Sequence, residues 1–317
     1  MRALALDGTV RFRTDYPKPS ANGTDVLVRV LTAGVCETDL QLIKGYMGYR
    51  GVLGHEFVGV AENGPFAGRR VVGEINCACR TCDTCKAGLQ THCPNRTVLG
   101  ILNHDGAFAD RIAVPQVNLH AVPDAISTDV AVFTEPVAAA YQIPAQVHIS
   151  RGDRIVVLGD GRLGNLCAQV LAGLSDHVLV VGKHPEKLAL LQARGIATAL
   201  VTDAIGDRMA DIVVECTGSD TGLPSALKLV RPRGTIVLKT TVAGAQTLPW
   251  APFVIDEVTL VGSRCGPFDR ALDGLARGDV DVLPLITDRF DLSHGLAALQ
   301  RAQVRPVLKV LIDVSRQ

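Results

Sequence analysis

The sequence predicts two fold types in one chain: a mostly β domain followed by an α/β domain with a doubly wound parallel sheet. Short β-rich runs punctuated by Gly, Pro and Asn fill residues 1–135. From about residue 150, apolar runs alternate with helical patterns, and a glycine motif follows the first of these runs. With 317 residues, the chain is long enough for two domains of ordinary size.

The N-terminal part contains apolar runs of strand length at 26–30, 57–61 and 70–72. These runs are rich in β-branched residues and are bounded by turn residues. They therefore predict the strands of a compact, mostly antiparallel domain.

The second part alternates strand-like and helix-like segments, which is typical of βαβ units and of a parallel sheet. Helices are predicted over 163–173 and 185–194. The predicted strands are 154–158, 178–181, 212–216, 234–239 and 259–261. The spacing of these five strands predicts a doubly wound sheet of the six-stranded type.

After Gly266 the pattern changes to a helix at 268–277, a Leu-rich helix at 293–302 and a closing strand at 307–312. A strand that follows a completed parallel sheet needs another sheet to join. We therefore predict that residues 1–140 and 268–317 form one domain and that residues 141–267 form the other.

The composition excludes partners that are recruited by charge. Lys plus Arg and Asp plus Glu both total 32, so there is no net field to attract nucleic acid or an anionic membrane surface, and a small molecule is the expected partner. No run of eighteen apolar residues appears, and the apolar start at Met1 breaks after a few positions. This argues against a spanning helix and a signal peptide, and we expect a cytoplasmic protein.

Four cysteines, Cys79, Cys82, Cys85 and Cys93, lie in a Cys-x2-Cys-x2-Cys-x7-Cys run. The spacing lets one short loop surround a single tetrahedral ion, which indicates a closed structural zinc site. A looser set of ligand types, Cys36, His55, Glu56 and Glu135, lies in the same half of the chain. Mixed ligands that leave a position open are typical of a catalytic zinc.

The predicted strand 154–158 runs directly into Gly159-Asp-Gly161-Arg162-Leu163-Gly164 and then into a helix. In this order, Gly159 permits the tight turn, Gly161 lets the backbone approach a pyrophosphate, and Gly164 lets helix and strand pack closely. The helix N-terminus then faces the phosphates. The motif predicts a bound dinucleotide.

The second strand of the unit decides which nicotinamide is preferred. Enzymes that use NAD usually place an acidic residue at its end, but here the strand ends in Gly182-Lys183-His184. Loss of the acid and gain of a base favour NADP(H) over NAD(H). On this reasoning, Gly182→Asp with Lys183→Ala should shift the preference toward NAD.

Taken in order, these motifs resemble those of zinc-dependent medium-chain dehydrogenases/reductases, which include alcohol, polyol and threonine dehydrogenases. The motifs that carry the resemblance are Gly34-Val-Cys36-Glu-Thr38-Asp39, Gly54-His55-Glu56-Phe-Val-Gly59, the four-cysteine lobe, Glu135-Pro136 and the glycine motif. The resemblance implies a GroES-like catalytic domain, a Rossmann domain, a catalytic zinc and a structural zinc. It also implies hydride transfer between a small alcohol or carbonyl and the nicotinamide, in a homodimer or homotetramer.

The resemblance further implies a role for each residue near the open site. Cys36 and His55 resemble the first two catalytic zinc ligands, and Glu135 resembles the position of a further ligand or of a group that holds water. Glu56 can approach or exchange onto the metal, so either glutamate remains a candidate ligand. Asp39 resembles the carboxylate that orients the zinc histidine, and Thr38 resembles the hydroxyl that passes on the substrate proton.

Other positions resemble cofactor contacts of the same family. Arg264 and Lys309 resemble basic residues near the cofactor phosphates, and Arg162 is a further candidate for the pyrophosphate. Thr217-Gly218 resembles the turn under the nicotinamide half. Gln41 stands where some relatives place a histidine of the proton relay, so the further path of the proton stays open.

Two other interpretations compete with this one. A zinc-independent enoyl or quinone reductase of the same superfamily has the dinucleotide unit but lacks Cys36, His55 and the cysteine lobe, whose presence disfavours it. A non-catalytic nucleotide-binding protein on this fold would bind the cofactor without metal-dependent turnover. The metal content of the purified chain distinguishes all three.

Overall fold

The computed structural model describes residues 1–317 except 204, 242–247, 249, 305 and 316–317. The chain divides into two compact units. The first unit joins Met1–Glu135 to Leu285–Gln317, and the second unit is Pro136–Pro284. No helix in the described part of the chain is long and apolar enough to cross a lipid bilayer.

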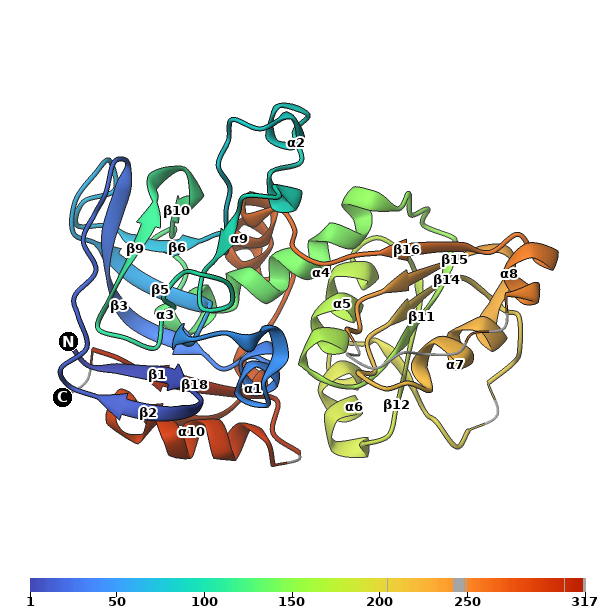
Figure 1. Cartoon of the computed structure of the whole chain (residues 1–317). Helices are drawn as coiled ribbons and strands as arrows, with labels where there is room; N and C mark the ends of the chain where they lie inside the picture. The colour runs from blue at the N-terminus through green and yellow to red at the C-terminus, as the bar shows by residue number, and fades with distance from the viewer. Residues whose placement is uncertain (204, 242–247, 249, 305, 316–317) are drawn as a thin grey trace. The chain divides into compact units, whose positions relative to one another are not determined.

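The first unit is mostly β, as predicted (Figure 1). Its strands are β1 (Ala3–Asp7), β2 (Thr9–Arg13), β3 (Asp25–Gly34), β4 (Gly51–Val52), β5 (Glu56–Ala61), β6 (Arg70–Gly73), β7 (Asn76–Cys77), β8 (Thr97–Val98), β9 (Arg111–Pro115), β10 (Leu119–Ala121), β17 (Ile286–Asp291) and β18 (Lys309–Asp313). Its helices are α1 (Glu37–Ile43), α2 (Asp83–Lys86), α3 (Thr128–Ala131) and α10 (Gly295–Ala302), with 3₁₀ turns at Tyr46–Gly48, Gln90–His92, Gln116–Asn118 and Leu292–His294. A further 3₁₀ turn, Leu283–Leu285, spans the boundary between the units.

The main sheet of this unit has the strand order β10-β6-β5-β3-β18-β17, with β9 also paired to β3. The pairs β3–β5 and β3–β18 are antiparallel, and β17–β18 is parallel. The C-terminal strand thus lies next to β3, which comes from the other end of the sequence. In the first half of β3, Val26, Val28 and Val30 are buried and the residues between them are partly or fully exposed, because one face of this part of the strand packs on the core.

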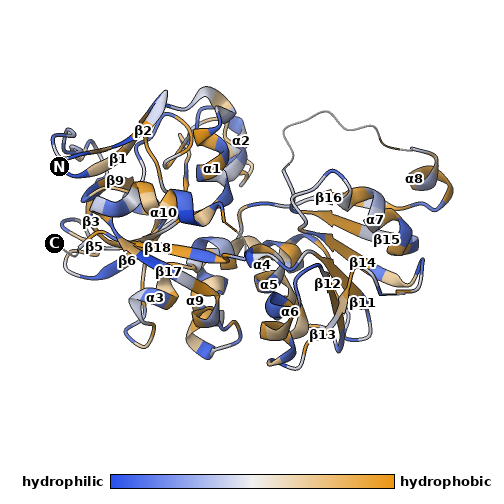
Figure 2. Ribbon diagram, turned by 90° about the horizontal axis from the view of Figure 1, so that it is seen from below, coloured by the Kyte–Doolittle hydropathy of each residue, from blue (hydrophilic) through white to orange (hydrophobic). Residues whose placement is uncertain are grey.

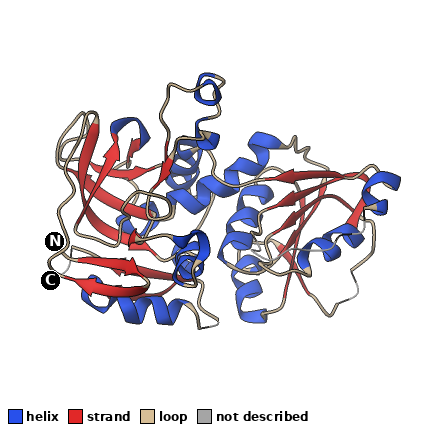
Figure 3. Cartoon of the chain, viewed as in Figure 1, coloured by secondary structure: helices blue, strands red, loops and turns tan. Residues whose placement is uncertain are grey.

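The second unit contains the predicted doubly wound parallel sheet, in the strand order β13-β12-β11-β14-β15-β16. Its strands are β11 (Arg154–Leu158), β12 (His177–Gly182), β13 (Ala197–Leu200), β14 (Ala210–Glu215), β15 (Val230–Leu238) and β16 (Thr259–Gly262). Its helices are α4 (Thr134–Gln146), which starts at the boundary of the units, α5 (Arg162–Ala172), α6 (Pro185–Gln192), α7 (Gly222–Leu229), α8 (Ala251–Ile255) and α9 (Phe268–Arg277). Helices cover both faces of this sheet (Figure 3).

The strands of the second unit read as nearly continuous apolar runs because both faces of the sheet are buried. Val156, Val213 and Ile236 are at most 1% exposed and share one core with α7. Figure 2 shows the hydrophobic colour along these strands. Strand β13 is not among the strands predicted from the sequence. It is a short edge strand with partly exposed side chains, so it lacks the continuous apolar run that marks the central strands.

The predicted domain boundaries at 140 and 267 differ from this division, because residues 268–284 are part of the second unit. The reason is that this segment contacts helices of the second unit. A Cβ at Gly274 would collide with the hydroxyl of Tyr141 in α4, and the backbone N–H of Asp281 donates to Oε1 of Gln169 in α5 at 2.7 Å. The chain therefore returns to the first unit only near Leu285.

Candidate functional site

The four lobe cysteines converge as their spacing predicts. The sulfur atoms of Cys79, Cys82, Cys85 and Cys93 all lie within 4.8 Å of one another. The distance is 3.5 Å from Cys82 to Cys85, 3.5 Å from Cys93 to Cys79 and 3.8 Å from Cys82 to Cys93. Sulfurs bound at ~2.3 Å to one tetrahedral zinc ion are separated by ~3.8 Å, so this donor set fits zinc.

The lobe favours the thiolate form at Cys79, whereas burial raises the pKa of Cys85 to about 12. Backbone N–H groups of Thr81 and Cys82 point at the sulfur of Cys79 and lower its pKa to about 5. The short helix α2 begins directly after Cys82 and carries Cys85, so one turn of helix presents both sulfurs to the same point. The lobe can therefore hold its ion without help from a distant part of the chain.

A second group of metal-ligand types forms around the start of β5. The ligand atoms of Cys36, His55 and Glu56 lie within 4.8 Å of one another. Antiparallel pairing of β3 with β5 places Gly34 opposite Glu56, and this register carries Cys36, two residues beyond β3, to His55. His55 is 3% exposed and Glu56 is fully buried. We call these three residues the Cys36 cluster.

Asp39 supports the cluster from the first turn of α1. Its fully buried carboxylate accepts hydrogen bonds from the backbone N–H of Cys36, at 2.9 Å, and of Gly54, at 3.1 Å. Its Oδ1 lies 3.4 Å from Nδ1 of His55, which leaves Nε2 of the imidazole for a ligand. Burial lowers the pKa of His55, but the carboxylate of Asp39 and the sulfur of Cys36 outweigh it and raise this pKa well above its ordinary value.

Thr38 lies beside the cluster on the same turn of α1. Its Oγ1 is 3.8 Å from the sulfur of Cys36, and its side chain is half-buried. Gln41, one turn later, donates a hydrogen bond of 2.7 Å to Glu37 on the exposed side of the helix. The structure thus brings Thr38 to the cluster, while Gln41 bonds within its own helix.

Glu135 is not a member of the Cys36 cluster. It lies in the first turn of α4, where a negative charge is favoured by the helix dipole. Among the residues that the structure describes, the groups of ligand atoms close enough to share an ion do not include Glu135. Of the two candidate glutamates, only Glu56 is therefore brought to Cys36 and His55.

Lys309 occupies a place that the sequence did not suggest. Instead of an exposed position facing cofactor phosphates, its side chain is fully buried in β18, and its ammonium group forms an ion pair with Glu56. It also donates to the carbonyl oxygen of Val35, at 3.4 Å. Burial lowers the pKa of Lys309 to about 8, against the raising effect of Cys36 and Asp39.

Gly34 is needed for this pair. A Cβ at Gly34 would lie 2.5 Å from Cε and Nζ of Lys309 and 2.7 Å from Oε2 of Glu56. The Gly34 of the sequence motif therefore leaves the volume that the two charged side chains occupy. No local sequence signal could have identified this partner, because Lys309 and Glu56 meet only through the pairing of β3 with both β5 and β18.

The glycine motif has the geometry expected of a dinucleotide loop. Gly159 has φ +113°, and a Cβ there would lie 2.7 Å from the carbonyl oxygen of Cys216. A Cβ at Gly164 would collide with the carbonyl of Gly159, so α5 packs closely on β11. Gly161 is the N-cap of α5, and a Cβ there would meet no atom within 4 Å. The backbone of Gly161 is therefore open to the approach of a ligand at this helix N-terminus.

The other predicted cofactor residues of the second unit lie at the carboxyl ends of its strands. Gly182, Lys183 and His184 follow β12, Thr217 and Gly218 follow β14, Arg264 follows β16, and Arg162 and Leu163 open α5. The loop after β14 is held by Glu215, whose Oε1 accepts from the backbone N–H of Thr217 at 2.8 Å. The carboxyl edge of a doubly wound sheet is where such folds bind ligands.

Asp160, inside the glycine motif, is a residue that the sequence analysis did not select. Its side chain is 8% exposed and reaches the end of β12. There, Oδ2 accepts hydrogen bonds from the backbone N–H of Lys183, at 2.6 Å, and of His184, at 2.7 Å. The sequence contains one signal that could have identified Asp160: an acidic residue lies between two glycines of the motif, and the strand end at position 182, where an acid is usual, is a glycine.

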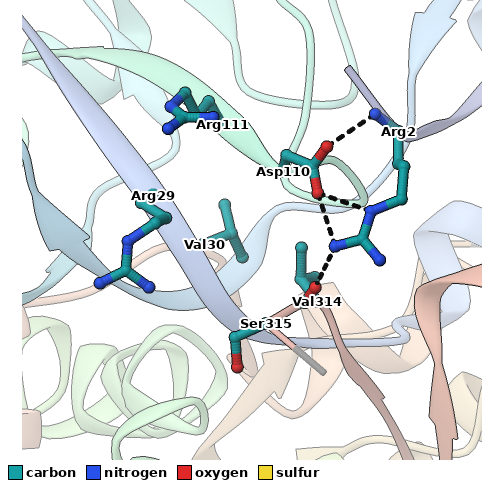
Figure 4. A pocket seen from close by; sticks show the side chains of 7 residues that line it. All are labelled: Arg2, Arg29, Val30, Asp110, Arg111, Val314 and Ser315. Carbon is teal, nitrogen blue, oxygen red and sulfur yellow. Dashed lines mark hydrogen bonds and ion pairs between the residues drawn. The ribbon is translucent and has the colours of Figure 1, made fainter. Parts of the chain in front are cut away.

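A further pocket of about 480 Å³ lies in the first unit (Figure 4). Arg2, Arg29, Asp110 and Arg111 contribute its charged lining. The side chain of Arg2 is held by Asp110, at 2.8 Å, and by the carbonyl oxygen of Val314, also at 2.8 Å. The pocket contains none of the predicted site residues, so we attribute no part of the chemistry to it.

Comparison with known proteins gives matches over nearly the whole chain. The model of the alcohol dehydrogenase GroES-like domain matches residues 22–124, and that of the zinc-binding dehydrogenase matches residues 163–277. The chain is 28% identical to a sorbitol dehydrogenase of Halalkalibacterium halodurans, over 98% of this chain and 99% of the relative. It is 30% identical to an L-threonine 3-dehydrogenase of Streptomyces avermitilis, over 94% of both chains.

Solved structures agree with these relatives. The alcohol dehydrogenase TADH from Thermus sp. ATN1 superimposes with a TM-score of 0.89 at 27% identity, over 99% of this chain and all of the other. The similarity therefore extends through both units and is not confined to the dinucleotide motif.

Proposed function

Because this chain belongs to the zinc-type medium-chain dehydrogenase/reductase family and is an oxidoreductase that binds NAD(P), we propose that it is a zinc-dependent dehydrogenase of alcohols or polyols that prefers NADP(H). The observation that carries the proposal is the convergence of Cys36, His55 and Glu56 on one point. The hydride would move between the carbon of the alcohol or carbonyl and the nicotinamide.

The Cys36 cluster fits a catalytic zinc by its donor atoms. A thiolate, an imidazole and a carboxylate are ligands that zinc accepts, and a site with three protein ligands leaves a fourth position for substrate. Oε1 of Glu56 is buried and makes no hydrogen bond to any described residue, which suits a nearby cation. When bound, zinc would supply Lewis-acid polarisation of the substrate oxygen.

The surrounding side chains then have separate tasks. Asp39 places a negative charge 3.4 Å from Nδ1 of His55, which favours a proton on Nδ1 and leaves Nε2 for the metal. Thr38 offers a hydroxyl beside Cys36 that can accept the substrate proton and pass it toward solvent. Lys309 pairs with the buried carboxylate of Glu56, so this negative charge is buried together with a positive one.

We infer a structural role for the cysteine lobe, because four thiolates close the coordination shell and leave no position for substrate. The preference for NADP(H) rests on the end of β12. Position 182 has no acidic side chain there, and Lys183 is exposed beside it. A cytoplasmic location suits a chain whose cysteine cluster must stay reduced to bind metal.

Metal analysis with an activity screen tests the function. We expect two zinc ions per subunit, oxidation of polyols or simple alcohols with a higher kcat/KM for NADP+ than for NAD+, and loss of activity when a chelator removes the accessible ion. The screen covers polyols, sugars, amino alcohols and simple alcohols. One zinc without turnover would indicate a non-catalytic protein, and turnover without zinc would indicate a reductase of the zinc-independent kind.

We further propose a homodimer formed through β16. This strand is an edge of the six-stranded sheet, and Leu260 within it is 39% exposed. In nearby α8, Val254 is 76% and Ile255 is 77% exposed. Exposed edge strands with apolar neighbours tend to pair, and antiparallel pairing of two copies of β16 is compatible with a two-fold axis.

Light scattering coupled to gel filtration tests the dimer. Leu260→Asp with Val254→Asp should convert the protein to a monomer, because it places charge in the apolar contact. Val117→Asp, which alters a 52% exposed valine of the first unit, should leave the dimer intact. A monomeric wild type, or a double variant that stays dimeric, would refute the proposed interface.

A further inference from the structure

The carboxylate of Asp160 reaches the loop that follows β12. Besides the two backbone N–H groups of Lys183 and His184, Nδ1 of His184 lies 3.0 Å from both of its oxygens. The side chain thus connects the loop after β11 to the loop after β12. These two loops are the ones that, in this fold, contact the pyrophosphate and the adenosine ribose.

Asp160 fills the volume that a side chain at position 182 would need. A Cβ built on Gly182 would lie 2.5 Å from both Cβ and Oδ2 of Asp160. Position 182 is the strand end at which NAD enzymes usually carry the acid that binds the ribose hydroxyls. The negative charge that is missing from position 182 is therefore supplied, at nearly the same point, from position 160.

This carboxylate remains ionised near neutral pH. Burial raises the pKa of Asp160, but hydrogen bonds from the His184 side chain and from the backbone N–H groups of His184 and Lys183 outweigh this and hold the pKa below its ordinary value. A carboxylate has about four acceptor positions, and Oδ1 receives only the His184 ring among the described hydrogen bonds. It retains capacity for a ribose hydroxyl.

We propose that Asp160 is a specificity-determining residue of the cofactor site, whose charge opposes a 2'-phosphate and so limits the preference for NADP(H) that Lys183 produces. This inference rests on the proposed use of a nicotinamide cofactor. It also revises the sequence-based exchange at Gly182, because an aspartate introduced there would collide with Asp160. The acid at 182 can be tested only after the acid at 160 is removed.

The proposal is tested by binding, so that neither zinc nor substrate affects the readout. Fluorescence titration gives the Kd of NADPH and of NADH for the wild type, Asp160→Ala, Asp160→Asn and Asp160→Ala with Gly182→Asp. We expect both single variants to favour NADPH over NADH by about tenfold more than the wild type, because a nearby negative charge is lost. The double variant should return the ratio toward the wild-type value.

Asp176→Asn is the matched control. It removes one charge from the opposite, amino end of β12, where Asp176 pairs with Arg151 at 2.9 Å, and should leave the ratio unchanged. If Asp160 only held the loop, both affinities would fall in parallel, and an unchanged ratio in folded Asp160→Asn would overturn the proposal. If the wild type binds neither nucleotide, both this proposal and the proposed use of a nicotinamide cofactor fail. If it binds the nucleotides but shows no turnover, only the proposed reaction is contradicted.

Discussion

Replacing His55 with alanine should lower kcat/KM for alcohol oxidation about a thousandfold, because the Cys36 cluster then loses the ligand that Asp39 orients. A loss of this size corresponds to ~4 kcal/mol of transition-state stabilisation, which is the order expected of a metal that polarises the substrate oxygen. Steady-state kinetics and zinc analysis of the same preparation measure it. The zinc content should fall by one ion per subunit while the lobe keeps its own.

His120→Ala provides the control for this experiment. His120 is also partly buried and also lies against a carboxylate, with its Nε2 3.0 Å from Oε1 of Glu74, but it is outside both metal clusters. Its replacement should leave zinc content and kcat/KM close to those of the wild type. If His55→Ala keeps its zinc and its activity, the open metal site is not at the Cys36 cluster.

Replacing Lys309 with methionine should lower the free energy of unfolding by ~3–5 kcal/mol, because the fully buried carboxylate of Glu56 then loses the lysine that faces it, while Cys36 and Asp39 keep further negative charge nearby. Methionine retains most of the volume of the lysine chain, so the change removes charge more than packing. Urea unfolding of the zinc-loaded protein, followed by circular dichroism, measures the difference.

A double-mutant cycle separates charge from packing. Lys309→Met with Glu56→Gln should be less destabilised than Lys309→Met alone, since both members of the pair are then neutral. Arg111→Met is the surface control, because the Arg111–Glu62 pair, at 3.0 Å, is about one-third exposed and should change stability by less than ~1 kcal/mol. A loss below ~1 kcal/mol in Lys309→Met would contradict the buried pair.

The family resemblance, the two fold types and the identity of the protein as an oxidoreductase are confirmed by the matches over both units. These conclusions were accessible from the sequence because their signals are local. The cysteine lobe lies within one loop, and the glycine motif lies within one βα turn. The central strands of the parallel sheet were likewise predictable, because strands that are buried on both faces are continuous apolar runs in the sequence. The edge strand β13 is partly exposed and has no such run, so it was not predicted.

What the sequence by itself determined, then, was the architecture and the ligand types, since spacing and periodicity act over a few residues. Tertiary structure alone decided the pairing of Glu56 with Lys309 and the placement of Asp160 over Gly182. It also decided that residues 268–284 belong to the second unit. Each of these depends on contacts between segments far apart in the chain. The effect of a buried charge or of a glycine is set by the side chain that lies against it, and the fold alone brings that side chain there.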